Sequence, residues 1–436
     1  MFKFYILFYL ILFLIRRDHL KSSSQLSKVK SRRLKKLMRH LKNSPYYKSY
    51  ASQNSLEVFP VINKELFMRF FDDINTCGIK KAEASDLAER AERSRNFSET
   101  LNDVTVGLST GTSGNKGLFL AGERERAKWA AAVIHRVIGL SLRSRKIAFF
   151  LRANSKLYES ANSRLLKFSF FDLMNDHDTN FKRLTGLNAD ILVAQPSVLL
   201  KIASSFSTSG QTSAFKKVIS VAEVLNSTDR AYLEKTFRLN IDEVYQCTEG
   251  FLACSCKSGR LHFNEDFLII EKEYIDEEQK RYYPVITDLY RKTQPIVRYR
   301  LDDILAEGSS CTCGSRFEVI EKIEGRADDI IKLIDNSGNL IDIFPDYLSR
   351  AITISSDEIT DYMLTQTEEN KLEIYINNES EITREAVRNN ICELLSKFRI
   401  GPATIHFTTI KDLDMRTKLR RIRNEYYKRM QDNGNR

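Results

Sequence analysis

The chain has 436 residues, 42% hydrophobic and 29% charged, which is typical of a folded protein of two or three domains and excludes long disorder. The net charge of +11 is concentrated in residues 1–50, which hold 13 Lys/Arg and the single acid Asp18. The remainder carries 55 basic and 56 acidic residues, so we expect no nucleic-acid partner for the body of the protein.

The first predicted element is an apolar helix, Phe4 to Ile15, followed by a basic segment that runs to about residue 42. This helix has 12 residues and would be about 18 Å long. About 20 residues are needed to span the hydrocarbon core of a membrane. No small-residue cleavage site follows, which argues against a signal peptide. We favour a helix on an anionic membrane surface, and packing on the body stays open. We expect a cytoplasmic protein. If the helix binds a membrane surface, we expect the protein at the inner face of the membrane.

The next informative segment is "LSTGTSGNKGLFL", residues 108–120, which follows a short β-prone run and precedes an amphipathic helix at 122–142. A phosphate-binding loop needs exposed N–H groups and hydroxyl donors. The segment offers Gly111, Gly114, Gly117, Ser109, Thr110, Thr112, Ser113 and the cation Lys116. The Walker pattern does not fit, because glycine follows Lys116. The flanking strand and helix argue against a linker.

Strands alternate with helices in the following stretch. The runs 146–151, 189–195 and 215–225 predict strands, and 196–206 and 227–237 predict helices. This alternation predicts a parallel or mixed α/β sheet. Residues 251–320 predict a β-rich subdomain, and the strand–helix–strand pattern of 371–409 predicts a separate small domain.

Four cysteines form two C-x-C pairs, Cys254 with Cys256 and Cys311 with Cys313. Four thiolates arranged tetrahedrally make a closed structural Zn²⁺ site, in which His262 could replace one ligand. Disulfides fit a cytosolic enzyme less well. Zinc and plain buried thiols both stay open.

The hydroxyl- and glycine-rich loop resembles the nucleotide-phosphate loop of adenylate-forming enzymes, the superfamily of acyl- and aryl-CoA ligases. Further motifs of that superfamily follow in order and bring the resemblance to residues 105–425: "SVAEVL", "VYQCTEG", "TDLYRKTQPIVRYRLDDIL", "GRADDIIKL" and "MRTKLRRIR".

The resemblance implies a role for each matched residue. Tyr245 is the residue that stacks on adenine, and Ala222 and Glu223 line the adenine side. Thr248 contacts phosphate and Glu249 binds Mg²⁺. An aromatic face beside a hydroxyl and a hard carboxylate suits a nucleotide–magnesium complex. In this sequence Gln246 and Cys247 follow Tyr245, where the superfamily motif usually has a glycine and one further residue.

The later motifs complete the implied ATP site. Asp303 is the match for the carboxylate that holds both ribose hydroxyls, with Asp302 as the neighbouring alternative. Arg326 matches the arginine near ribose and phosphate, and Asp328 matches the hinge between domains. Lys418 matches the adenylation lysine, although the customary glycine before it is absent; a solvated basic tail is the alternative.

Within the superfamily, the chain resembles phenylacetate–CoA ligases and the related CapK-like proteins of surface-polysaccharide clusters in its "RYR" form, in "GRLHFNED" and in the C-x-C-G before the hinge. CapK-like proteins often begin with an apolar and basic segment. The resemblance implies an α/β fold: a large adenylate-forming domain with mixed sheets and a β-rich subdomain, and a small mobile α+β C-terminal domain. We expect an N-terminal segment 1–42, a large domain 43–327 and a small domain 328–436.

The implied activity has two half-reactions. Mg-ATP activates a small-molecule carboxylate as an acyl-adenylate, and the acyl group then passes to an acceptor, most simply the thiol of coenzyme A. A role in surface-polysaccharide biosynthesis follows from the CapK resemblance alone. Two alternatives stay open: direct transfer to an amine or sugar, and a non-catalytic, membrane-associated relative.

Overall fold

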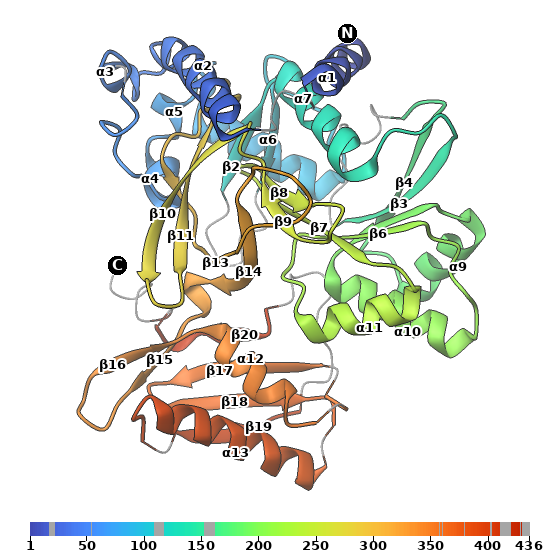
Figure 1. The fold of residues 1–436 in the computed structure, drawn as a ribbon, viewed down its shortest axis with the longest axis vertical. Coiled ribbons are helices and arrows are strands. Elements are labelled where there is room, and N and C mark those ends of the chain that lie inside the picture. Colours follow the sequence, from blue (N-terminus) through green and yellow to red (C-terminus); the bar gives the residue numbers. More distant parts are fainter. Residues whose placement is uncertain are drawn as a thin grey trace. The chain divides into compact units, whose positions relative to one another are not determined.

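The computed structural model describes residues 1–436 except 17–21, 54, 109–116, 152–161, 357, 360, 379, 402, 410–419, 428 and 430–436. The chain divides into two compact units (Figure 1). Unit 1 consists of Met1–Leu225, Arg230–Leu301 and Ala306–Lys322. Unit 2 consists of Asn226–Asp229, Asp302–Leu305 and Ile323–Arg436.

Unit 1 begins with helices. The first two are α1 (Phe2–Arg16) and α2 (Ser23–Leu41), and α2 begins where the Ser22 hydroxyl accepts a hydrogen bond from the backbone N–H of Gln25. Three short helices and one longer helix follow: α3 (Lys48–Ala51), α4 (Lys64–Arg69), α5 (Phe71–Ile74) and α6 (Lys81–Ser94). Within the described part of the chain, every helix is too short or too polar to cross a membrane.

The segment expected to bind phosphate lies between two strands. Strand β1 (Thr105–Leu108) pairs antiparallel with β2 (Leu118–Ala121), and Leu108 lies opposite Leu118. Helix α7 (Glu123–Val133) follows and continues as a π-helical turn, η2 (Ile134–Ile138). The helix expected at 122–142 is confirmed over residues 123–138, whereas β2 was not predicted, because its four residues are too few to show a strand period.

The centre of unit 1 is a parallel sheet in the order β4-β3-β5-β6-β7. Its strands are β3 (Arg145–Leu151), β4 (Leu166–Asp172), β5 (Ile191–Ala194), β6 (Lys217–Val221) and β7 (Ile241–Cys247). Helices α9 (His177–Leu187), α10 (Pro196–Ser209) and α11 (Ser227–Phe237) connect successive strands from β4 onward. Strand β5 is buried at all four positions, as a central parallel strand requires. The predicted α/β sheet is confirmed, with β4 as an added strand.

The sheet continues through antiparallel strands, as expected for the β-rich region. Their order is β10-β11-β13-β14-β9-β8, next to β7, and β12 pairs with β11. The bounds are β8 (Gly250–Ser255), β9 (Leu261–Phe263), β10 (Leu268–Asp276), β11 (Arg281–Asp288), β12 (Tyr299–Arg300), β13 (Asp303–Glu307) and β14 (Val319–Arg326). Strands β13 and β14 contribute residues to both units.

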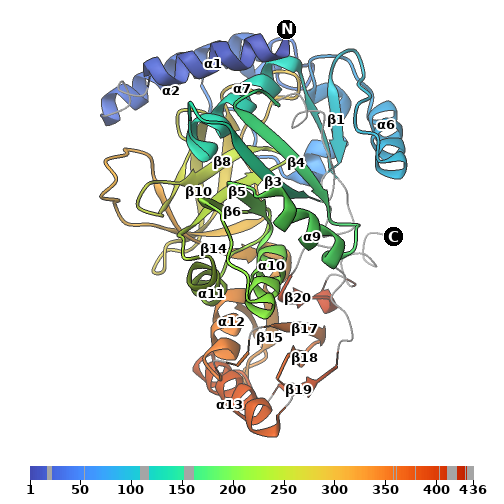
Figure 2. The ribbon, with the colours of Figure 1, turned by 90° about the vertical axis from the view of Figure 1, so that its right-hand side faces the viewer.

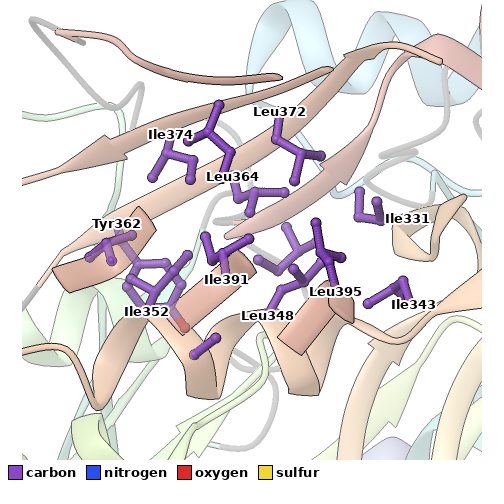
Figure 3. Packing of buried hydrophobic residues seen from close by; sticks show 14 of the residues in the cluster. Ile331, Ile343, Leu348, Ile352, Tyr362, Leu364, Leu372, Ile374, Ile391 and Leu395 are labelled. Carbon is purple, nitrogen blue, oxygen red and sulfur yellow. The ribbon is translucent and has the colours of Figure 1, made fainter. Parts of the chain in front are cut away.

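Unit 2 is a small α+β unit with its own core (Figure 3). After η3 (Ala327–Asp329) come the hairpin β15 (Ile331–Ile334) and β16 (Leu340–Ile343) and helix α12 (Pro345–Thr353). A four-stranded sheet follows in the order β19-β18-β17-β20, built from β17 (Tyr362–Glu368), β18 (Lys371–Ile376), β19 (Thr404–Phe407) and β20 (Ile422–Asn424). Helix α13 (Glu381–Lys397) connects β18 to β19, and its buried Ile391 and Leu395 pack in the same core as Leu364 and Ile374.

Candidate nucleotide-binding site

The carboxyl ends of the parallel strands carry the polar residues predicted to bind the nucleotide. Strand β6 ends before Ala222 and Glu223, and β7 ends before Thr248 and Glu249. Because these neighbouring strands are parallel, their carboxyl ends meet at one edge of the sheet. Ligands of open α/β sheets bind at this edge. The structure therefore brings these two predicted motifs to the edge where a ligand is expected.

Glu223 is fixed by a sharp turn and by a helix terminus. Ala222 adopts a left-handed backbone conformation with φ 69°, which is uncommon for a residue other than glycine. The backbone N–H of Glu223 bonds back to the Val221 carbonyl at 2.9 Å. Its carboxylate accepts the N–H of Ser197, in the first turn of α10, at 3.2 Å. The positive end of that helix thus orients the Glu223 carboxylate.

Thr248 and Glu249 form the two-residue connection between β7 and β8, in which Cys247 pairs with Gly250. The Thr248 hydroxyl donates to the Glu249 carboxylate at 2.8 Å. Hydroxyl and carboxylate oxygens side by side are the hard ligands that Mg²⁺ prefers. The chemistry of this donor pair fits the role expected for it. Tyr245, the expected adenine-stacking residue, lies earlier on β7 and is 8% exposed.

Arg291 is a residue that the motif analysis missed. Its guanidinium donates to the carbonyl oxygens of Thr248 at 2.6 Å and Leu120 at 3.0 Å. Arg291 thereby ties the Thr248–Glu249 turn to β2, the strand that follows the glycine-rich loop. The buried Asp288 carboxylate holds the start of this segment by accepting the backbone N–H groups of Tyr290 and Arg291. Burial raises the pKa of Asp288, and these hydrogen bonds oppose that effect.

Two further contacts fix the same region of unit 1. The Glu125 carboxylate accepts the N–H of Gly122 at 2.8 Å and that of Thr293 at 2.8 Å. The side-chain oxygen of Gln294 accepts the N–H of Leu120 at 2.9 Å. The C-terminal end of β2 is therefore attached to the segment that carries Arg291. No motif signalled the contacts to Thr293 and Gln294, because they join residues 168 and 174 positions apart.

Unit 2 contains the second group of predicted nucleotide-binding residues. Arg326 lies 3.6 Å from the Asp302 carboxylate and 3.7 Å from the Asp328 carboxylate. Burial disfavours the charged guanidinium, but Asp303, Asp328 and Asp302 outweigh it and raise the pKa of Arg326. The Asp302 carbonyl also accepts the N–H of Ala327 at 2.7 Å, which joins the start of β13 to η3. The structure thus brings the four predicted residues Asp302, Asp303, Arg326 and Asp328 together.

This group in unit 2 has hydrogen-bonding capacity left over. Among the described residues, neither Nε of Arg326 nor Oδ2 of Asp328 has a hydrogen-bond partner, although both atoms are buried. An unpaired buried polar atom costs about 1–3 kcal/mol. A polar ligand such as a ribose or phosphate could complete these bonds, so the group fits a nucleotide.

The neighbouring residue Asp329 is bound from the C-terminal segment. Nε of Arg420 donates to the Asp329 carboxylate at 2.7 Å. Burial raises the pKa of this carboxyl, and the Arg420 charge opposes the shift. Arg420 follows the predicted adenylation lysine, Lys418, by two positions. Lys418 itself lies outside the described residues, as do Ser109, Thr110, Gly111, Thr112, Ser113, Gly114 and Lys116 of the glycine-rich loop. Gly117 is described and buried.

The arginines of the "RYR" motif have structural partners. Arg298 has φ 45° and makes a two-pronged ion pair with Glu271, at 2.8 Å for the closest atoms. It also donates to the carbonyl of Phe59 at 2.8 Å. Arg300 pairs with Glu273 at 3.2 Å. These ion pairs link β12 to β10 across the intervening strand β11, and Asp302 and Asp303 follow Arg300 by two and three residues.

The expected cysteine group requires one correction. Cys256, Cys311 and Cys313 come together, but the fourth member is His262 and not Cys254. The Cys254 sulfur instead contacts the Asn264 side chain at 3.8 Å. Spacing alone paired Cys254 with Cys256, whereas the β8–β9 turn brings His262 to the group.

Comparisons with known proteins place the fold. No family model matches the chain, and no curated protein matches it in sequence. Among solved structures, the chain is similar to 2-hydroxyisobutyryl-CoA ligase in the postadenylation state, with a TM-score of 0.69, 14% identity and coverage of 96% of this chain and 94% of that one.

Two amide-forming enzymes are also similar. The AtGH3.15 acyl acid amido synthetase matches with a TM-score of 0.62 and 13% identity over 94% of this chain and 93% of that one. The amide bond synthetase McbA from Marinactinospora thermotolerans matches with a TM-score of 0.53 and 10% identity over 73% and 68%. The chain therefore has the mixed α/β fold of adenylate-forming ligases.

Proposed function

We propose that this protein is an AMP-forming ligase that activates a carboxylate with Mg-ATP. One observation carries the proposal: in a fold shared with adenylate-forming ligases, the expected phosphate- and magnesium-binding pair Thr248–Glu249 and the expected Glu223 follow the carboxyl ends of two neighbouring parallel strands. The buried cluster around Arg326 in unit 2 supplies a second group with free hydrogen-bonding atoms.

The first half-reaction forms an acyl-adenylate. A carboxylate oxygen of the substrate bonds to the α-phosphorus of ATP, and the bond from that phosphorus to the bridging oxygen breaks, which releases pyrophosphate. Both reactants are anions, so catalysis depends on alignment and on neutralising charge. Thr248 and Glu249 would hold Mg²⁺, which supplies charge neutralisation when bound. Lys418 contributes a second positive charge, and the glycine-rich loop holds the leaving phosphates.

The residues of unit 2 are assigned to the nucleoside and to the exchange between half-reactions. Asp303, with Asp302 as the alternative, accepts hydrogen bonds from the ribose hydroxyls, and Arg326 donates to ribose or phosphate. Asp328 is the proposed pivot at the start of the small domain of residues 328–436. A change at this pivot would expose the adenylate to the acceptor.

The acceptor is proposed to be the coenzyme A thiol. One similar structure is a CoA ligase, and an open form of the same enzyme was solved with CoA. Amide synthetases share the fold, so transfer to an amine is the second candidate. The role in surface-polysaccharide biosynthesis stays a prediction that rests on the sequence resemblance alone.

The test of the proposed function is ATP–pyrophosphate exchange over a panel of aromatic, aliphatic and amino acids. We expect exchange that depends on one class of acid. Lys418→Ala should abolish exchange but preserve acyl transfer from a preformed adenylate, and Lys411→Ala, in the same segment, should preserve both. Normal exchange in Lys418→Ala would refute the assignment of this lysine. A non-catalytic relative would show no exchange with any acid.

We further propose that residues 1–42 attach the enzyme to an anionic membrane surface. Helix α1 packs on α7 through one face (Figure 1). On this face the rings of Phe2, Tyr5 and Tyr9 lie under the cations of Arg126, Arg124 and Lys128, at 5.5, 5.0 and 4.9 Å. Helix α1 therefore packs on the body of the protein, which is the alternative that the sequence left open. Only one face of the helix takes part in this packing.

The other face of α1 is apolar and open to solvent. Its exposed side chains recur every three or four residues and are Phe4, Leu7, Phe8, Ile11, Leu14 and Ile15. Phe4 is 68% exposed and Ile15 61%. Side chains at this spacing form one stripe along a helix. A contiguous apolar stripe on a protein surface marks an interaction site.

A basic face of α2 supplies the matching charge. Its exposed cations are also spaced by three or four residues and are Lys28, Arg32, Lys35, Arg39 and Lys42. Both helices lie at the same end of unit 1 in Figures 1 and 2. An apolar stripe and a row of cations at one end of the unit fit a headgroup layer of anionic lipid, at about 1 kcal/mol per cation near the surface.

Cosedimentation with phosphatidylcholine vesicles, with and without phosphatidylglycerol, tests this attachment. The full chain should bind the anionic vesicles, and Phe8→Asp should reduce binding at least tenfold. The matched control is Leu142→Asp, which places the same charge at an isolated apolar residue that is 97% exposed. Arg32→Glu with Arg39→Glu should weaken binding to anionic vesicles only. Equal binding by Phe8→Asp and Leu142→Asp would refute the α1 surface.

A further inference from the structure

Three thiols and one imidazole converge in unit 1, apart from the residues assigned to the nucleotide. Cys256 follows β8, His262 lies on β9, and Cys311 and Cys313 lie in the connection between β13 and β14. Their four ligand atoms lie within 4.8 Å of one another. We propose that these four residues bind one structural Zn²⁺ ion.

The spacing of the ligand atoms matches a tetrahedral zinc site. The sulfur atoms of Cys256 and Cys311 are 3.7 Å apart, and the Cys313 sulfur is 3.5 Å from Nε2 of His262. With Zn–S bonds of about 2.3 Å and tetrahedral angles, the sulfur atoms of two ligands should be about 3.7 Å apart. A disulfide would bring the sulfur atoms to about 2.05 Å. The cysteines are free, so their thiols are available as ligands.

His262 is oriented as a zinc ligand should be. It is 4% exposed, and its Nδ1 lies 2.8 Å from the carbonyl oxygen of Phe317. A carbonyl can only accept, so Nδ1 carries the proton in the neutral ring and Nε2 keeps its lone pair. Nε2 is the atom that faces the Cys313 sulfur. A ligating histidine whose second nitrogen donates to a carbonyl is the usual arrangement in metal sites.

Backbone N–H groups point at all three sulfur atoms. Ser258 N–H donates to Cys256 at 3.4 Å, and Ser315 N–H donates to Cys313 at 3.4 Å. The N–H of Cys313 donates to Cys311 at 3.5 Å. In each case the donor is two residues after the cysteine, so the backbone turns around the sulfur. Backbone bonds of this kind orient the ligand atoms of a metal site.

The donor set selects the metal and its role. Three sulfur atoms and one imidazole nitrogen suit Zn²⁺ and not the oxygen-seeking Mg²⁺ or Ca²⁺. All four ligands come from the protein, which leaves no open position for a substrate, so the ion would be structural. It would fasten the 308–318 connection to the β8–β9 turn, both within unit 1.

Metal content is the first test. The full chain, expressed in zinc-supplemented medium and measured by mass spectrometry, should carry one zinc per chain. Cys311→Ser should lose at least nine-tenths of that zinc, and Cys254→Ser, which changes a cysteine outside the group, should keep it. Wild type without zinc, or equal loss in both variants, would overturn the proposal.

A second measurement does not depend on whether a variant folds. Wild-type protein stripped of metal and titrated with Co²⁺ should develop intense visible bands and thiolate-to-cobalt charge-transfer absorption with a one-to-one endpoint. Addition of Zn²⁺ should displace the cobalt and remove the colour. The weak spectrum of octahedral cobalt would contradict a Cys₃His site.

Discussion

The two groups of proposed nucleotide-binding residues differ in how they are held. In unit 1, the Thr248–Glu249 turn is fixed by strand pairing and by the guanidinium of Arg291 on the Thr248 carbonyl. In unit 2, Arg326 is surrounded by carboxylates, and the buried atoms Arg326 Nε and Asp328 Oδ2 have no hydrogen-bond partner in the described part of the chain.

This difference suggests a division of work. Groups held by backbone hydrogen bonds are set in place before the substrate arrives and can act on the transition state. Groups held by charge with bonds left to make gain partners when a ligand binds. Substitutions in unit 1 should therefore lower kcat, and substitutions in unit 2 should chiefly raise the KM for ATP.

The largest effect is expected for Glu249→Gln. The amide keeps the shape and removes the charge that would hold magnesium, so kcat for adenylation should fall about 10²–10³-fold. Glu278→Gln, at an exposed turn of the same unit, is the matched control and should match wild type. Initial rates of pyrophosphate exchange measure both. A change in KM alone would contradict the role assigned to unit 1.

Arg326→Ala should raise the KM for ATP about 10- to 100-fold with a smaller change in kcat, because a charge-assisted hydrogen bond is worth about 1.5–3 kcal/mol. Arg350→Ala, an exposed arginine of unit 2, is the control. Steady-state kinetics over a range of ATP concentration provides the test. If KM stays unchanged, the cluster does not contact the nucleotide.

Arg291→Lys should lower kcat about tenfold, since lysine keeps the charge but cannot bridge the Thr248 and Leu120 carbonyls with one planar group. The KM for ATP should change little. A variant with wild-type kcat would show that the turn is held adequately by strand pairing alone.

The last prediction concerns stability and not catalysis, through Lys128, a buried cation of unit 1. Burial lowers the pKa of Lys128 from 10.5 to about 7; Arg33 adds to the shift and Asp288 opposes it. Its ammonium lies 3.1 Å from the centre of the Tyr290 ring. Between these pH values the unfolded chain binds the extra proton, so stability should rise with pH from about 7 to 10.5.

The expected slope is at most about 1.4 kcal/mol per pH unit, and it should vanish below pH 7, where both states are protonated. Melting temperatures of wild type and Lys128→Met across this range test the prediction. The difference between the two proteins should shrink as pH rises. A constant difference would mean that Lys128 does not lose its proton when folded.

The sequence predicted those parts of the site that are local in the chain. Thr248 and Glu249 are adjacent, and Glu223 follows its strand directly, so a short motif contains both the residue and its setting. The alternation of strands and helices likewise predicted the parallel sheet, because each crossover helix lies in the sequence directly between the two strands that it connects.

Contacts between distant residues escaped prediction. Arg291 acts on Thr248 and Leu120, and nothing in the intervening sequence connects them. The sequence indicated that His262 could replace one cysteine, but not that this cysteine is Cys254, because the β8–β9 turn and the 308–318 connection determine which ligand atoms meet. Strand β4 was not predicted, although its residues 166–170 alternate between apolar and polar side chains as a strand does.

The most direct test of adenylate formation traces the carboxylate oxygen atoms of the substrate with an isotope label. An acid found in the exchange panel is labelled with ¹⁸O in its carboxylate and turned over completely with ATP and acceptor. Attack of the carboxylate on the α-phosphorus leaves one carboxylate oxygen on that phosphorus, so the account predicts AMP that contains one ¹⁸O atom. Label in inorganic phosphate, or AMP without label, would contradict it.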